Sequence, residues 1–240
     1  MALELEQVVV DANDPVALGE WWANALGWVV VNDDPKEFEI RPTPEELPGL
    51  FFARVPEPKT VKNRVHLDLA SQTLDDQAAI VERLTSAGAT PANIGQGEQT
   101  WVVLCDPEQN EFCVLAPNER FNDLGALAAI VIDAQDPGAL APFWAEATGW
   151  EMEPPDEHGD IGLRNPVRPA PYLDILSVPE SKTQKNRLHF DFRPDDRDVE
   201  VARLLKSGAK HANVGQGDES WIVLQDPEGN EFCVLSSRDE

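Results

Sequence analysis

The chain has 240 residues, of which 42% are hydrophobic, so it can bury one or two substantial cores. Its formal net charge is −25 at pH 7, which repels nucleic-acid phosphates and anionic lipids, and we expect neither as a partner. The N-terminal residues MALELEQVVV do not resemble a signal peptide. The apolar stretches, such as ALAAIVI at 126–132, are too short to cross a membrane.

The sequence contains an odd number of cysteines, namely Cys105, Cys113 and Cys233. A sparse, odd set argues against a disulfide framework and suits a reducing compartment. We therefore expect a cytoplasmic protein. Cys105 has no counterpart in the second half of the chain, where Gln225 stands, and it is assigned no function.

The second half of the chain repeats the first. Residues 101–115 read WVVLCDPEQNEFCVL and residues 221–235 read WIVLQDPEGNEFCVL. Earlier blocks repeat in the same order, so the chain is a tandem duplication and any site it carries should occur twice. The boundary falls in the polar, aperiodic segment 116–125, which predicts two domains at residues 1–118 and 125–240.

The first half begins with an apolar, β-branched segment, followed by a helix that starts at Asp14-Pro15 and ends at Gly27. A second helix is predicted between Thr73 and Gly88. The segments expected to be strands are Leu3–Val10, Trp28–Val31, Glu37–Arg41, Leu50–Val55, Arg64–Leu69, Thr90–Ile94, Trp101–Leu104 and Glu111–Leu115. The second half follows the same order, so the pattern predicts four βαβββ modules with helices on one face of each sheet.

One strand of each half carries a row of polar side chains. Side chains two apart share a face of a strand, so three polar residues alternate with apolar ones that face the helix. The rows are Arg64, His66 and Asp68 in the first half and Arg187, His189 and Asp191 in the second. Such a row cannot lie unpaired in a dry core, so it forms either an internal salt-bridge ladder or the lining of a ligand cavity.

The last strand of each half places Cys113 or Cys233 on the polar side of the sheet, where it could lie near the histidine. A buried thiol used as a small apolar group is the alternative. Trp101 and Trp221 open a strand in each half and could wall a pocket or pack at its rim. The triplets Lys62-Asn63-Arg64 and Lys185-Asn186-Arg187 could attract an anionic ligand or compensate nearby acidic groups.

With these motifs the chain resembles the glyoxalase-like branch of the vicinal oxygen chelate superfamily, which includes glyoxalase I, bleomycin-resistance proteins and extradiol dioxygenases. The resemblance rests on the strand–DP–helix–LGW pattern, the HxD strand and the terminal DPEGNEFCVL. It implies an α+β fold of four βαβββ modules in two tandem glyoxalase-like domains. The sheets would be mixed and cupped, with the ligand inside the cup.

The resemblance also implies where a metal could bind. Metal-dependent relatives use a His or Gln on the first strand, a Glu on the fourth, a His on the fifth and a Glu on the last. Here the first-strand position is Gln7, the fifth-strand histidine is His66, and the last position is Cys113. In the second half the matching residues are Ala129, His189 and Cys233, with Asp174 on the fourth strand. Hard ligands are few, so no metal or other cofactor is favoured; Gln7 and His66 are the ligands if a divalent ion binds.

We therefore expect a protein that binds a small organic molecule in its cupped sheets, without a family-type catalytic metal. Ligand-binding candidates are Arg64, Asp68, Cys113, Trp101, Arg187, Asp191, Cys233 and Trp221. His66 and His189 are the catalytic candidates in the alternative, a metal-dependent lyase, isomerase or dioxygenase. A second alternative is a structural or interaction protein whose cups are filled by side chains. Because the duplication can close its own domain interface, we expect a monomer.

Overall fold

The computed structural model describes residues 3–237, which form four α-helices, sixteen strands and one short 3₁₀ helix. Each module contains one helix followed by three strands, as the sequence pattern predicts. The helices are α1 (Pro15–Leu26), α2 (Leu74–Ser86), α3 (Pro137–Thr148), α4 (Arg197–Lys206) and the 3₁₀ helix η1 (Glu119–Phe121). None of the helices in residues 3–237 is long and apolar enough to cross a membrane.

The strands of the first half are β1 (Glu4–Ala12), β2 (Val29–Asp33), β3 (Glu37–Arg41), β4 (Gly49–Arg54), β5 (Val65–Leu69), β6 (Thr90–Pro91), β7 (Val102–Cys105) and β8 (Glu111–Val114). Those of the second half are β9 (Leu127–Ala134), β10 (Glu151–Met152), β11 (Ile161–Arg164), β12 (Tyr172–Ser177), β13 (Leu188–Arg193), β14 (Lys210–His211), β15 (Ile222–Gln225) and β16 (Glu231–Val234). The strand predicted at Thr90–Ile94 is much shorter than expected, because Pro91 has no N–H to donate and the chain turns at Gly95 with a positive φ of 86°.

The helix starts are as predicted. The Asp14 carboxylate accepts a hydrogen bond from the backbone N–H of Ala17, and Pro15 occupies the first helical turn of α1. Gly27 then ends the helix in the left-handed region, at φ 69°. Thr73 caps α2 by accepting a hydrogen bond from the N–H of Asp76 at 3.0 Å. These local signals fix where each helix begins and therefore which of its faces meets the sheet.

The strands form two eight-stranded mixed sheets, and each sheet combines modules from both halves of the chain. Sheet A runs β14-β15-β16-β13-β1-β4-β3-β2, and sheet B runs β10-β11-β12-β9-β5-β8-β7-β6. The first module therefore pairs with the fourth and the second with the third. Two antiparallel contacts join them, β1 to β13 in sheet A and β5 to β9 in sheet B. The domain limits 1–118 and 125–240 stay a prediction for the sequence repeats, and neither sheet is confined to one of those segments.

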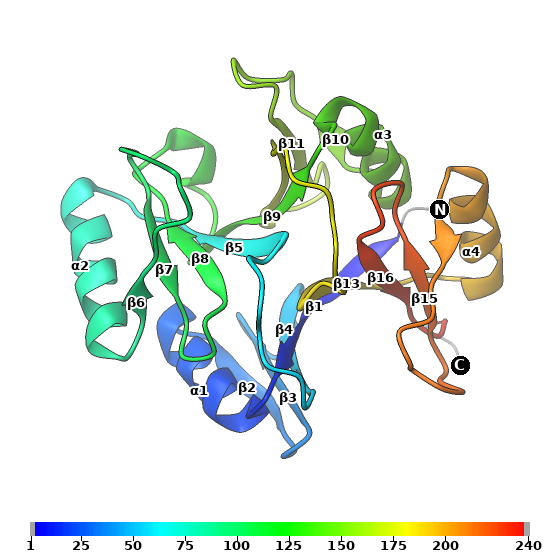
Figure 1. Cartoon of the computed structure of the whole chain (residues 1–240), viewed down its shortest axis with the longest axis horizontal. Coiled ribbons are helices and arrows are strands. Elements are labelled where there is room, and N and C mark those ends of the chain that lie inside the picture. The colour runs from blue at the N-terminus through cyan, green and yellow to red at the C-terminus, as the bar shows by residue number, and fades with distance from the viewer. Residues whose placement is uncertain (1–2, 238–240) are drawn as a thin grey trace.

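The helices lie on the outside of the molecule, and the segments that lead into β5 and β13 run through its centre (Figure 1). The helix-facing side of the sheets is packed with aromatic rings. Trp144 of α3 is fully buried against Phe190, Phe192 and Phe232. Its indole N–H also donates to the buried carboxylate of Asp226, at 3.2 Å. Burial of these rings stabilises the packing of α3 against β13 and β16 of sheet A.

The faces of the two sheets opposite the helices carry the polar rows. In β5, Val65, Leu67 and Leu69 belong to the core beneath the helices, while His66 and Asp68 point to the other face. The prediction from strand alternation is therefore confirmed. We call this face of sheet A cup A and that of sheet B cup B, after the cupped sheets that the resemblance implies.

This topology predicts how an isolated half behaves. Residues 1–118 contain β1 and β5 but neither of their partners β13 and β9. We expect this fragment to associate with a second copy through the unfilled strand edges, and to form a 1:1 complex when residues 125–240 are added. Light scattering after gel filtration gives the masses, with the intact chain as control. A folded, monomeric 1–118 fragment would contradict the topology.

Candidate functional site

Each cup contains a cluster of one histidine, one aspartate and one cysteine from two neighbouring strands. In cup A, Asp191 of β13 lies beside Cys233 of β16, and His189 precedes it on the same face. In cup B the same arrangement is made by Asp68 of β5, Cys113 of β8 and His66. One ligand atom from each of the three residues lies within 4.8 Å of the others in both cups. The structure thus brings together the predicted histidine, aspartate and cysteine candidates, once per cup.

Several polar atoms at these positions are buried and lack a partner. The Nε2 atom of His189 lies 3.6 Å from Oδ1 of Asp191, which is longer than a hydrogen bond. Asp191 Oδ1 and His189 Nδ1 are both buried without a hydrogen-bond partner, as is Oδ1 of Asp68 in cup B. Buried polar groups in folded proteins are nearly always paired, so such atoms indicate a ligand, an ion or a bound water.

Burial controls the protonation of the cup A residues. Burial raises the pKa of Asp191 to about 6, although the Gln7 amide donates a hydrogen bond to its carboxylate and Cys233 lies beside it. Burial, helped by the charge of Lys185, lowers the pKa of His189 to about 3. Burial and the neighbouring Asp191 raise the pKa of Cys233 far above its usual range. At neutral pH cup A therefore presents a neutral imidazole and a protonated thiol, which suit hydrogen bonding better than nucleophilic attack.

Cup B follows the same trend. Burial raises the pKa of Asp68, and burial together with Asp68 raises the pKa of Cys113 well above its usual range. Neither cysteine is therefore an activated nucleophile.

Arg64 and Arg187 do not reach the other residues of their rows. Arg187 donates to the backbone carbonyls of Asp11 and Glu57 at 2.5 and 2.9 Å, and it pairs with the carboxylate of Glu108. Arg64, in the first half, makes the equivalent contacts with the second half. It donates to the backbone carbonyls of Asp133 and Glu180 and pairs with the carboxylate of Glu228. The two arginines therefore form no salt-bridge ladder with the histidine and aspartate of their rows; such a ladder was one of the two possibilities for these strands. They tie one half of the chain to the other.

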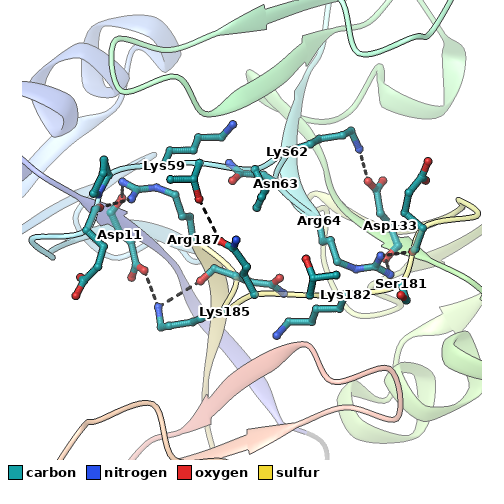
Figure 2. Close-up of a pocket in the computed structure, with 18 of the residues that line it drawn as sticks. Asp11, Lys59, Lys62, Asn63, Arg64, Asp133, Ser181, Lys182, Lys185 and Arg187 are labelled. Atoms are coloured by element: carbon teal, nitrogen blue, oxygen red, sulfur yellow. Dashed lines mark hydrogen bonds and ion pairs between the residues drawn. The ribbon is translucent and has the colours of Figure 1, made fainter.

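A cavity of about 730 Å³ lies between the two segments that lead into β5 and β13 (Figure 2). Six basic side chains line it: Lys59, Lys62, Arg64, Lys182, Lys185 and Arg187. Figure 2 shows Lys62 reaching Asp133 and Lys185 reaching Asp11, contacts that again cross between halves. Every one of the six has a carboxylate partner. The two basic triplets therefore compensate acidic groups, which was one of the two interpretations of the sequence.

Trp101 and Trp221 lie just before β7 and β15, at the outer ends of the sheets. Trp101 is 37% exposed, and Trp221 is half-buried. Their role as pocket walls stays a prediction.

The topology separates residues that the sequence reading grouped as metal ligands. Gln7 lies in cup A, where its side-chain amide donates to Asp191 at 2.9 Å, whereas His66 lies in cup B. Asp174 lies in cup B and not beside His189. The reason is that the first and fifth strands of one half belong to different sheets. Gln7 and His66 therefore cannot bind one ion.

The regrouped residues do not fit a family-type metal site. In cup A the fourth strand, Gly49–Arg54, has no carboxylate, and Cys233 stands where relatives have a glutamate. In cup B both oxygens of Asp174 accept hydrogen bonds from Arg120. The donor atoms of the remaining His–Asp–Cys sets lie within 4.8 Å of one another, but burial raises the pKa of Cys113 and Cys233, and a thiol must lose its proton to ligate zinc.

Arg120 and the neighbouring Phe121 are residues that sequence reasoning missed, because the segment 116–125 reads as a polar connection. A comparison of the two repeats could have indicated that extra residues fill cup B. Small residues in cup B stand at positions where cup A has charged or larger ones: Ala70 against Arg193, Ala128 against Glu6, and Gly162 against Glu39.

Four βαβββ modules that pair into two cupped sheets, with a histidine on the fifth strand of each repeat, define a paired-module α+β protein of the vicinal oxygen chelate type. The model of the glyoxalase-like domain matches residues 7–115 and again 129–235. The chain therefore belongs to the glyoxalase-like domain family, and the predicted resemblance and fold class are confirmed.

Solved structures agree with this fold. The chain is similar to glyoxalase I from Zea mays, with 14% identity and a TM-score of 0.68 over 98% of this chain and 92% of that one. It is also similar to a putative dioxygenase from Bacillus subtilis, with 13% identity and a TM-score of 0.69 over 99% and 86% of the two chains. No curated protein sequence matches. At these identities the likeness establishes the fold alone.

The pKa of Asp191 yields a test of the cup A geometry. With a folded pKa near 6 and an ordinary value near 3.8, the folded state holds a proton at pH 4–6 that the unfolded state has released. The contribution of Asp191 to stability therefore falls as pH rises through this window. We expect Asp191→Asn to match the wild type at pH 4 and to exceed its free energy of unfolding by about 3 kcal/mol above pH 7. Urea unfolding across this range is the measurement.

Exposed Asp123→Asn is the matched control, and its difference from the wild type should not depend on pH in the same way. A constant difference for Asp191→Asn between pH 4 and pH 7 would show that the Asp191 carboxylate is not desolvated.

Proposed function

We propose that this protein binds a small, oxygenated organic molecule in cup A, without a catalytic metal. The observation that carries the proposal is the pair of buried, unpartnered atoms His189 Nδ1 and Asp191 Oδ1 at the base of that cup. Leaving such groups unpaired costs on the order of 1–3 kcal/mol each, and a ligand that pairs with them recovers that free energy.

The polar and apolar groups of cup A indicate what kind of ligand it binds in this proposal. Asp191 Oδ1 accepts a hydrogen bond, so it calls for a hydroxyl or N–H on the ligand. His189 is neutral at pH 7 and offers one donor and one acceptor nitrogen. Gln7 holds the other oxygen of Asp191 and fixes the direction of the carboxylate. The adjacent wall is apolar, made by Val9 of β1 and the half-buried Phe51 of β4, which pair in register. A compact molecule with one oxygenated end and one apolar side matches this surface.

Binding is favoured over catalysis by the protonation states. Proton transfer at neutral pH is most efficient when the pKa of the catalytic group lies near 7, and that of His189 is near 3. The thiol of Cys233 stays protonated, and cup A lacks the family-type ligand set.

We extend the proposal to a monomeric protein of the cytoplasm. All three cysteines are free thiols, and each sheet finds its strand partners inside the same chain.

A thermal-shift screen of metabolites and antibiotics tests the proposal. We expect at least one compound to raise the melting temperature of the wild type. His189→Ala should weaken its binding about tenfold, because the lost hydrogen bond is worth up to about 1.4 kcal/mol. His66→Ala is the matched control in cup B and should leave the affinity unchanged. The shifts should persist in EDTA.

Two results would overturn the proposal. One is a broad panel that produces no shift, with no molecule retained on native mass spectrometry of the purified protein. The other is binding that His66→Ala abolishes while His189→Ala leaves it intact. A strict requirement for added divalent ions would instead support the metal-dependent alternative.

A further inference from the structure

The segment that joins the two halves enters cup B. Helix η1 begins where the side chain of Asn118 accepts a hydrogen bond from the N–H of Arg120, at 3.0 Å. The next residue, Phe121, is only 6% exposed and stacks edge-on against Tyr172 at 5.8 Å. Its other neighbours are residues of a separate small core in cup B: Ala70, Ala128, Ala129 and Val131. Cup B is therefore filled by the chain's own linker.

Arg120 makes a dense set of contacts inside the cup. Its two terminal nitrogens donate to the two oxygens of Asp174, at 2.8 and 2.6 Å, in a bidentate pair. One of them also lies 2.9 Å from a carboxylate oxygen of Glu153. The guanidinium lies over the Tyr172 ring, 3.7 Å from its centre. Two carboxylates and an aromatic face are the groups that recognise a planar guanidinium in proteins.

The absence of a side chain at Gly162 leaves space in the sheet for the Arg120 guanidinium. A Cβ atom at Gly162 would lie 2.0 Å from an Arg120 nitrogen and 2.9 Å from Asp174 Oδ1. The backbone of Gly162 is not in the left-handed region, so the glycine provides space rather than conformational freedom. The matching residue of cup A is Glu39, which fills its position with a carboxylate that pairs with Arg41 at 2.5 Å. The guanidinium pocket is therefore a property of cup B alone.

We propose that Asp174, Glu153, Tyr172 and Gly162 form a guanidinium-binding site that Arg120 occupies from within the chain. Without the Arg120 side chain, the same site in cup B binds an alkylguanidinium ligand; in the native chain Arg120 of the linker occupies it. The site is separate from the one proposed in cup A and does not depend on it. A tethered group competes at an effective concentration on the order of millimolar, so dilute alkylguanidinium does not displace Arg120 from the wild type.

Methylguanidinium is the probe, and Arg120→Ala is the variant that vacates the pocket. We expect methylguanidinium at about 1–20 mM to raise the melting temperature of Arg120→Ala by a few degrees in a saturable way. The wild type should show a smaller rise that begins only at higher concentrations, because tethered Arg120 competes for the same pocket. Methylammonium at the same concentration carries the charge without the planar fork, and it should not reproduce the effect.

The matched control is Arg120→Ala combined with Asp174→Asn, which removes the bidentate acceptor. We expect its response to methylguanidinium to fall to the wild-type level. An equal, saturable shift in the double variant, or no shift in Arg120→Ala, would overturn the proposal. If the double variant does not fold, calorimetric titration of Arg120→Ala decides, because the site requires one methylguanidinium per chain. This test measures binding in cup B only. Its failure would leave the cup A proposal intact, because that proposal is tested separately with His189→Ala.

Discussion

The antiparallel pairing of β1 with β13, and of β5 with β9, is the constraint on which the rest of the structure depends. In sheet A the register sets Gln7 opposite Asp191 and Val9 opposite His189. Because side chains alternate along a strand, a slip of one residue would turn the polar row into the helix-packed core. The crossing of halves is also what places Arg187 against the Asp11 carbonyl and Arg64 against the Asp133 carbonyl. Each cup is thus a joint product of both repeats.

The duplication lets the two cups be compared within one molecule. Both keep histidine, aspartate and cysteine in the same relation, so the difference lies in what surrounds them. Cup A holds an ion-pair network in which Glu6 contacts both Arg193 and Arg41, and these charges keep that part of the cup polar. Cup B replaces this network with alanines and the ring of Phe121, whose burial contributes roughly 2–3 kcal/mol. One cup is therefore occupied by residues of the linker, whereas the other is lined by charged side chains.

Much of this arrangement could be predicted from the sequence. The period of two in β5 and β13 predicts which side chains face the cup, and the DP helix starts predict where the helices begin. The pairing of modules could not be predicted, because identical strand patterns permit pairing within a half or between halves. Gln7 was consequently grouped with His66, and Asp174 with His189. The role of Arg120 was also hidden, because a short 3₁₀ segment has no periodicity and its binding pocket comes from strands more than thirty residues away in the chain.

The distribution of charge supports our proposal that a ligand binds in a cup rather than in the central cavity. The chain has only 19 basic residues against 44 acidic ones, yet six of the basic residues line the central cavity. Acidic groups from both halves meet there, among them Asp11, Asp133, Glu111 and Glu231, and without counter-charges they would repel the halves from one another. Because each cation is already paired, this cavity offers an incoming anion little uncompensated positive charge. Besides the Nε atoms of Arg64 and Arg120, the buried polar side-chain atoms of residues 3–237 that lack partners belong to His189, Asp191 and Asp68, and our proposal places a ligand where it could pair with such atoms.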